Sequence, residues 1–307
     1  MKIDAVFQGG GVKAIGLVGA INRLEKENIS WQRLAGTSAG AIIASLLAVG
    51  YTGDQLSDII QRLDYKKFKG KKGIQKVPIV GQAIGIFSSK GLYDTNGIEQ
   101  FLRDLYEKKD KTKFKHISYN GRSRLKIIAS DVTNNRMLIL PEDIAYYGID
   151  PMELDIATAV VMSISIPFYF SPITLKHDNT KAFIVDGGLI SNFPIWIFDV
   201  KGIPRWPTIG FKFEEEIDKD FNCKMCQNGF LSYVKDIIDA SLDCYDERFI
   251  RDEDKIRTIS IPTLGVKATN FNLVQSKKDD LFKAGYDKCN EFLESWDFKE
   301  YINQYRV

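Results

Sequence analysis

Apolar residues in the first fifty positions repeat one pattern twice, a short apolar run followed by a helical one. The runs at 3–7 (IDAVF) and 29–35 (ISWQRLA) predict two strands. After the first, apolar residues recur every three or four positions as far as residue 28. After the second, an Ala/Ile/Leu-rich run continues until Gly50. Two successive strand–helix units predict parallel strands whose carboxyl ends meet at one edge of a sheet.

The same reading of apolar spacing predicts an α/β chain beyond residue 50. Helices are expected over 54–63, 96–107, 155–162, 234–249 and from Ser276, and strands over 125–129, 137–140, 182–185, 208–213 and 256–261. No repeat, low-complexity tract or linker divides the sequence. We therefore expect one α/β domain over residues 1–307, with helices on both faces of a largely parallel central sheet.

Composition adds little to this picture. The chain has 307 residues, a hydrophobic content of 44% and a net charge of +2, so no nucleic-acid partner is expected from charge. We find no convincing signal peptide and no uncharged run long enough to span a membrane. Four cysteines suggest reduced thiols in a cytoplasmic protein. The single pair Cys223 and Cys226 lacks the second pair or histidines of a zinc site, and its role stays open.

A basic segment lies between the predicted helices at 54–63 and 96–107. Its lysines are Lys66, Lys67, Lys69, Lys71, Lys72 and Lys76, and an apolar, glycine-broken run follows at 77–87. Such a segment suits a flap in peripheral contact with an anionic membrane surface. A solvated lysine loop over an ordinary hydrophobic segment explains it equally well.

The turn after the first strand contains Gly9, Gly10 and Gly11, with Lys13 close behind. Backbone without side chains, ahead of a helix and beside a lysine, forms an anion cradle. The phosphate-binding spacings of Walker and Rossmann motifs are absent. The turn could hold a phosphate, could be an oxyanion hole for an ester carbonyl, or could be no more than a tight turn.

The turn after the second strand reads Gly36-Thr37-Ser38-Ala39-Gly40. A Gly-x-Ser-x-Gly sequence between a strand and a helix is the pattern of a nucleophile elbow, which exposes the serine hydroxyl at a helix N-terminus. Small residues are needed there because the backbone is cramped. An N-capping serine or a packing site for small residues is the alternative.

A third turn, Asp186-Gly187-Gly188, follows the predicted strand at 182–185; alone, it suits a common Asp-Gly turn. Together with the glycine turn, the Ser38 turn and residues 163–172, in this order, it resembles the patatin-like phospholipase family. The resemblance covers about two-thirds of the chain. It implies a patatin-like three-layer sandwich and a Ser-Asp dyad, with Ser38 as nucleophile and Asp186 as base. It also implies an oxyanion hole from Gly9 to Gly11, with the basic residue of that motif at Lys13.

The histidine inventory agrees with a dyad. The chain has only His116 and His177. A triad in the order Ser, acid, His could use only His177, with Asp131 or Asp155 as the acid. His177 lies in a polar stretch typical of a solvated turn. A lone carboxylate has an ordinary pKa of about 4, so burial and contact with Ser38 must tune it into a base.

The resemblance implies hydrolysis of acyl esters of phospholipids and related lipids without a metal or other cofactor. We expect a serine esterase of the phospholipase A or lysophospholipase type, acting through an acyl-serine intermediate. One alternative is an acyltransferase that uses the same serine. The other is a non-catalytic module whose glycine turn binds a phosphate or a lipid headgroup.

Overall fold

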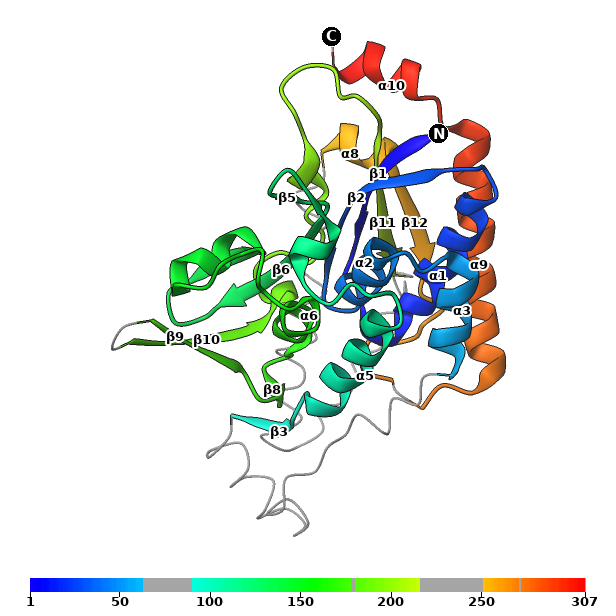
Figure 1. Ribbon diagram of the computed structural model, residues 1–307. Coiled ribbons are helices and arrows are strands. Elements are labelled where there is room, and N and C mark those ends of the chain that lie inside the picture. Colours follow the sequence, from blue (N-terminus) through cyan, green and yellow to red (C-terminus); the bar gives the residue numbers. More distant parts are fainter. Residues whose placement is uncertain (63–89, 178–179, 216–250, 271, 307) are drawn as a thin grey trace.

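The computed structural model describes residues 1–62, 90–177, 180–215, 251–270 and 272–306. Its described residues form an eight-stranded sheet in the order β12-β11-β1-β2-β6-β10-β9, and β7 pairs with β6 (Figure 1). The strands are β1 (Lys2–Phe7), β2 (Ser30–Thr37), β6 (Leu125–Asp131), β7 (Arg136–Leu140), β9 (Ile173–His177), β10 (Thr180–Asp186), β11 (Thr208–Glu214) and β12 (Thr258–Pro262).

The strands from β12 to β6 are parallel, and the remaining pairs, β6–β7, β6–β10 and β10–β9, are antiparallel. The expected largely parallel α/β sheet is therefore confirmed. The antiparallel direction of β10 matters for the site because it brings the end of β10 level with the end of β2, on the other side of β6. The four residues between β6 and β7 are too few for a helical crossover, so these two strands run antiparallel.

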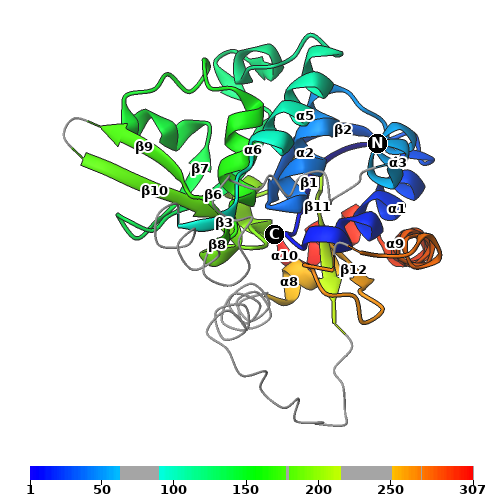
Figure 2. The ribbon, with the colours of Figure 1, turned by 90° about the horizontal axis from the view of Figure 1, so that it is seen from below.

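Helices cover both faces of the sheet (Figure 2). The α1 and α2 helices pack on one face, and α3, α5, α6 and α9 pack around them. On the other side lie the helices α8 and α10 (Figure 2) and a short 3-10 helix, η7, which packs against Val6 of β1. The bounds are α1 (Ala14–Glu25), α2 (Ala39–Val49), α3 (Gly53–Arg62), α5 (Asn96–Glu107), α6 (Ile156–Ile164), η7 (Ile195–Phe198), α8 (Asp252–Ile256), α9 (Gln275–Ser295) and α10 (Phe298–Tyr305).

Alternation along β1 divides the core between the two faces. Ala5 and Phe7 belong to the large cluster under α1 and α2, and the Phe7 ring stacks on Phe211 at 4.7 Å between centroids. Val6 points the other way and packs with residues of η7. The strand is buried on both faces, as expected for a central parallel strand.

Smaller elements complete the described chain. A parallel pair joins β3 (Gly91–Tyr93) to β8 (Phe168–Phe170), and a hairpin joins β4 (Ser118–Tyr119) to β5 (Arg122–Ser123). The remaining 3-10 turns are η1 (Gly11–Lys13), η4 (Phe114–Ile117), η5 (Glu142–Tyr147) and η6 (Gly187–Leu189). None of the helices in the described ranges is long and apolar enough to cross a membrane.

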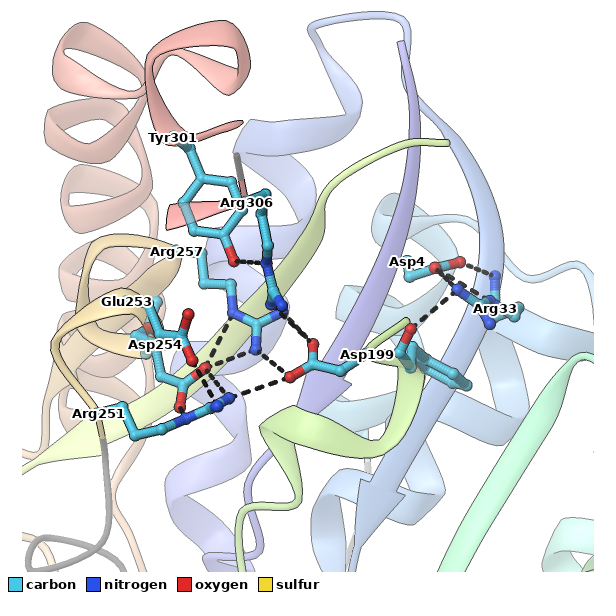
Figure 3. A network of polar contacts seen from close by, with 11 residues as sticks. Asp4, Arg33, Asp199, Arg251, Glu253, Asp254, Arg257, Tyr301 and Arg306 are labelled. Atoms are coloured by element: carbon cyan, nitrogen blue, oxygen red, sulfur yellow. Dashed lines mark hydrogen bonds and ion pairs between the residues drawn. The ribbon is translucent and has the colours of Figure 1, made fainter. Parts of the chain in front are cut away.

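A network of arginines and carboxylates links the end of η7 to α8 and to the end of α10 (Figure 3). Arg257 donates from Nη1 to Asp199 Oδ1 at 2.7 Å and from Nη2 to Asp254 Oδ1 at 2.5 Å. Arg306 of the C-terminal segment reaches the same Asp199 at 3.4 Å. Nearby, Arg33 of β2 pairs with the fully buried Asp4 of β1.

Most predicted elements are present, and a few boundaries were wrong. The helix at 96–107 has the predicted bounds. The predicted strand at 256–261 starts later, at Thr258, because Ile256 is the last residue of α8. The C-terminal helix begins at Gln275, one residue before the predicted start at Ser276. The lysine-rich segment with the run at 77–87, the Cys223/Cys226 pair and the helix at 234–249 lie outside the described residues.

Candidate active site

Strand register brings Ser38 and Asp186 to the same level of the sheet. In the β2–β6 pair Thr37 lies opposite Ile128, and in the β6–β10 pair Asp186 lies opposite Ala129. Ser38, one residue past Thr37, is thus level with Asp186 across β6. The chain after Asp186 then crosses the end of β6, since a Cβ on Gly187 would lie 2.3 Å from the Ile128 carbonyl oxygen.

Ser38 sits at a strained strand-to-helix turn. Its φ of 53° and ψ of −125° are a conformation that non-glycine residues rarely adopt. The flanking glycines are required by space: a Cβ on Gly36 would lie 2.3 Å from the Gly40 carbonyl oxygen, and one on Gly40 would lie 2.3 Å from that of Phe7. This is the geometry expected of a nucleophile elbow.

A hydrogen-bond chain from α6 holds this turn in place. The Ser38 backbone N–H donates to Ser163 Oγ at 2.8 Å, and the Ser163 hydroxyl donates to the Ile128 carbonyl at 2.6 Å. Both serines are buried. The next hydroxyl, that of Ser165, bonds back to the Val161 carbonyl at 2.7 Å. A buried backbone N–H needs an acceptor, and Ser163 supplies it.

The Ser38 hydroxyl donates to Asp186 Oδ2 at 2.6 Å. The other carboxylate oxygen, Oδ1, accepts the Gly188 backbone N–H at 2.8 Å, and the Asp186 N–H donates to the Ser165 carbonyl at 2.9 Å. Asp186 is fully buried. Burial raises its pKa to about 7, and the hydrogen bonds from Ser38 and Gly188 oppose that rise.

The glycine turn lies directly beside Ser38. A Cβ on Gly9 would lie 3.0 Å from Ser38 Cβ and 2.2 Å from Asn192 Oδ1, so a side chain there would enter the site. The Gly9 N–H donates to the Asn192 carbonyl at 3.2 Å, and Asn192 Nδ2 donates to the Gly9 carbonyl at 3.2 Å. For the N–H groups of Gly10 and Gly11, the described residues provide no acceptor.

Lys13 is buried just behind this turn. Its ammonium donates to Glu215 Oε1 at 2.9 Å and lies 5.5 Å from the centre of the Phe213 ring. That ring also closes the space beside Gly10, where a Cβ would lie 2.3 Å from it. The lysine therefore ties the glycine turn to the end of β11.

The histidines lie away from this constellation. The backbone of His177 pairs with Thr180 at the far end of the β9–β10 hairpin, six residues from Asp186, or roughly 20 Å along an extended strand. His116 lies at η4, where its Nδ1 accepts the backbone N–H groups of Thr112 and Lys113.

The acids considered for a triad are engaged elsewhere. Asp131 accepts hydrogen bonds from Tyr147, Asn134 and the Thr133 backbone; burial raises its pKa, but these bonds outweigh burial and leave it lowered. Asp155 pairs with Arg103 at 3.2 Å. Neither acid makes a described contact that would orient a histidine toward Ser38.

Two contributors to the site have no role in the sequence analysis. Ser163 falls within the segment at 163–172 that resembles the family, and Asn192 lies four residues past Gly188. Two hydroxyls, at 163 and 165, at the end of a mostly apolar helix are the signal that could have drawn attention to Ser163. In the part of the chain that the structure describes, no group of three or more His, Cys, Asp or Glu side chains could hold a metal ion.

The fold and the site together define an α/β protein with a serine at an elbow turn, hydrogen-bonded to a buried aspartate. A family model described as Patatin-like phospholipase matches residues 5–199. The chain belongs to this family, and the resemblance read from the motifs is confirmed. Membership in the family supports a hydrolase that acts on lipids.

Relatives extend the similarity over most of the chain. The uncharacterized protein YqhO of Bacillus subtilis (strain 168) is 38% identical over 97% of this chain and 100% of its own length. The probable lipid hydrolase 463L of Invertebrate iridescent virus 6 is 27% identical over 62% of this chain and 61% of its own.

Two solved structures share the fold. VipD from Legionella pneumophila has a TM-score of 0.55 at 17% identity, and ExoU from Pseudomonas aeruginosa, in complex with SpcU, has 0.52 at 15%. Each match covers 95% of this chain but only 66% of the VipD chain and 52% of the ExoU chain. At this identity the likeness shows the fold alone.

Proposed function

We propose that this protein is a lipid acyl hydrolase of the phospholipase A or lysophospholipase type, with Ser38 as nucleophile and Asp186 as general base. The observation that carries the proposal is the 2.6 Å hydrogen bond between Ser38 Oγ and Asp186 Oδ2. A nucleophilic serine needs a base within hydrogen-bond reach. With a pKa raised to about 7 by burial, Asp186 is a stronger base than an ordinary carboxylate.

In the first half of the reaction, Asp186 takes the Ser38 hydroxyl proton as Oγ attacks the ester carbonyl carbon. The tetrahedral oxyanion accepts hydrogen bonds from Gly10 and Gly11, whose N–H groups have no acceptor among the described residues. The helix dipole of α2 adds positive potential at the same place. The carbon–oxygen bond to the leaving alcohol then breaks, and that alkoxide takes the proton from Asp186.

The second half repeats these steps with water. Asp186 removes a proton from the water that attacks the acyl-serine carbonyl, the same N–H groups stabilise the new oxyanion, and collapse releases the fatty acid. The proton returns to Ser38 Oγ. Gly9 serves differently from its neighbours in this scheme, since its N–H is bonded to Asn192 and its missing side chain leaves room beside Ser38.

The test is fatty-acid release from mixed phospholipid vesicles. We expect Ser38→Ala and Asp186→Asn each to lower release by about a thousandfold or more, because the two groups act as a unit. His177→Ala is the control and should keep wild-type activity. Release by the wild type should fall as pH drops through about 7, since a protonated Asp186 accepts no proton.

Other results would replace the proposal. Loss of activity in a folded His177→Ala variant would favour a triad. Transfer of the acyl group to added glycerol or lysolipid, in place of release, would favour an acyltransferase. Binding of headgroups without turnover, unchanged in Ser38→Ala and with no labelling of Ser38 by a fluorophosphonate, would favour a binding module.

A further inference from the structure

A surface pocket opens at the end of the sheet opposite Ser38. It has a volume of about 760 Å³ and is lined by residues from the start of β2, from η4, from the β4–β5 hairpin and from the segments before β6 and β11. Ser30 lines the pocket and Ser38 follows the last residue of the same strand, so the two sites lie roughly 25 Å apart along β2. In Figure 1 β5 lies near the start of β2, on the side of the sheet where the N-terminus lies.

The charge of this pocket has one sign. Its fourteen lining residues include four cations, Arg33, Lys111, Arg122 and Arg124, and no aspartate or glutamate. Two of the four already have partners. Arg33 pairs with the buried Asp4 at 2.5 Å, and Lys111 donates to the Val49 carbonyl at the end of α2 at 3.1 Å. A cation at a helix C-terminus is favourable by itself.

The other two cations, Arg122 and Arg124, pair with no carboxylate in the described ranges. Arg124 donates from Nη2 to the Trp31 carbonyl at 2.6 Å, but its Nε is buried with no acceptor among the described residues. The indole Nε1 of Trp206, another lining residue, is likewise buried with no acceptor among the described residues. Burial lowers the pKa of Arg124, which reflects the cost of a partly buried cation without a counter-charge.

The hairpin presents an aromatic ring beside the exposed arginine. Tyr119 lies directly opposite Arg122 in the β4–β5 pair, and the turn between them has positive φ at Asn120 (49°) and Gly121 (70°). These are the residues that a tight two-residue hairpin turn prefers, and the turn places Tyr119 opposite Arg122. Tyr119 is 81% exposed and lines the pocket, so its ring is accessible to a molecule bound there.

We propose that this pocket binds a small phosphate-bearing ligand, with Arg122 and Arg124 neutralising the phosphate. Guanidinium groups match phosphate oxygens in geometry and charge. The two arginines without a carboxylate correspond to the two charges of a phosphate monoester. The Tyr119 ring offers a face to a planar group on the ligand, such as a nucleoside base. The assignment is independent of the reaction at Ser38.

Isothermal titration calorimetry on the full chain tests the assignment, with inorganic phosphate, sn-glycerol 3-phosphate, AMP and uncharged adenosine as probes. The phosphate-bearing probes should bind and adenosine should not. Arg122→Gln should weaken their binding by about tenfold, the usual effect of losing a charge-assisted hydrogen bond. Arg136→Gln is the matched control, because Arg136 is also an exposed arginine beside a tyrosine, Tyr146, but does not line the pocket.

The probes also distinguish the source of the phosphate. Tighter binding of AMP than of sn-glycerol 3-phosphate, abolished by Tyr119→Ala, would identify a nucleotide; equal binding of both would show that the pocket recognises the phosphate group alone. The glycine turn beside Ser38 could also bind phosphate, and binding there would be as strong in Arg122→Gln as in Arg136→Gln. That result, or no binding of any phosphate-bearing probe, would overturn the assignment.

Discussion

Burial and hydrogen bonding act on the Asp186 carboxylate in opposite directions, and burial is the larger effect. Its folded-state pKa of about 7 exceeds the value of about 4 for an aspartate in an unfolded chain. The folded protein therefore binds this proton more tightly than the unfolded one. Stability from this group is fully present below pH 4 and is lost as pH rises from about 4 to about 7. A residue suited to accept a proton near neutral pH thus lowers the stability of the fold that carries it.

Asp186→Asn should recover this stability at high pH. Asparagine cannot ionise, but it can accept the Gly188 N–H and donate to Ser38 Oγ. Relative to the wild type, the free energy of unfolding of the variant should rise by about 2 to 3 kcal/mol between pH 5 and pH 8, at about 1.4 kcal/mol per pH unit. Urea unfolding at the two pH values measures it. The exposed Asp58→Asn is the control, and an equal difference at both pH values would contradict the assigned pKa.

At the scale of secondary-structure elements, the end of α6 determines the shape of the Ser38 turn. Ser163 Oγ accepts a hydrogen bond from the Ser38 N–H, and its hydroxyl donates one to the Ile128 carbonyl of β6. A strained turn persists only where its surroundings hold it. Here the support comes from a helix that is more than a hundred residues away in sequence.

Ser163→Ala should loosen this turn. It leaves a buried N–H without an acceptor, which costs about 1–3 kcal/mol in stability. If Ser38 is the nucleophile, kcat should fall more than KM rises, since the serine is misplaced while the lipid contacts remain. Ser165→Ala is the matched control two residues away, because its hydroxyl only bonds back within α6. Equal effects of both variants on kcat would rule out a specific role for Ser163.

Local patterns predicted the elements of the site better than the contacts between them. The glycine and serine turns could be located because each needs small residues at fixed spacing after a strand. The role of Asp186 as base was predicted only from the family resemblance. Its closeness to Ser38 depends on the register of β10 against β6, which local patterns do not reveal. Ser163 and Asn192 were missed for the same reason: neither a polar residue near the end of an apolar helix nor one in a loop indicates its distant partner.

At the scale of the whole molecule, partly buried ion pairs connect parts of the chain that are far apart in sequence. Asp199 follows η7, Arg257 follows α8 and Arg306 follows α10, and all three meet in the network of Figure 3. Nothing in the apolar spacing predicts this meeting. That residues 1–307 form one domain stays a prediction; this network joins the residues that follow α8 and α10 to the residue that follows η7.

Arg257→Ala should test how far the fold depends on that junction. The side chains of Arg257 and Asp254 are each 3% exposed, so truncation removes the buried cation from the buried Asp254 and leaves it only the more exposed Arg251. Loss of one partner of a buried pair costs about 3–5 kcal/mol. Arg251→Ala removes a neighbouring arginine from the same network, but that side chain is 53% exposed, so its loss should cost about 1 kcal/mol or less.

Urea unfolding of both variants gives the comparison, with fluorophosphonate labelling of Ser38 as a second readout below the unfolding transition. The network joins the start of the parallel strands, near Asp4 and Arg33, whereas Ser38 follows the end of β2. Labelling should therefore be retained in folded Arg257→Ala. Equal costs for the two arginines would mean that solvent screens the network throughout. Loss of labelling before unfolding would mean that the junction also shapes the Ser38 turn, which no described contact requires.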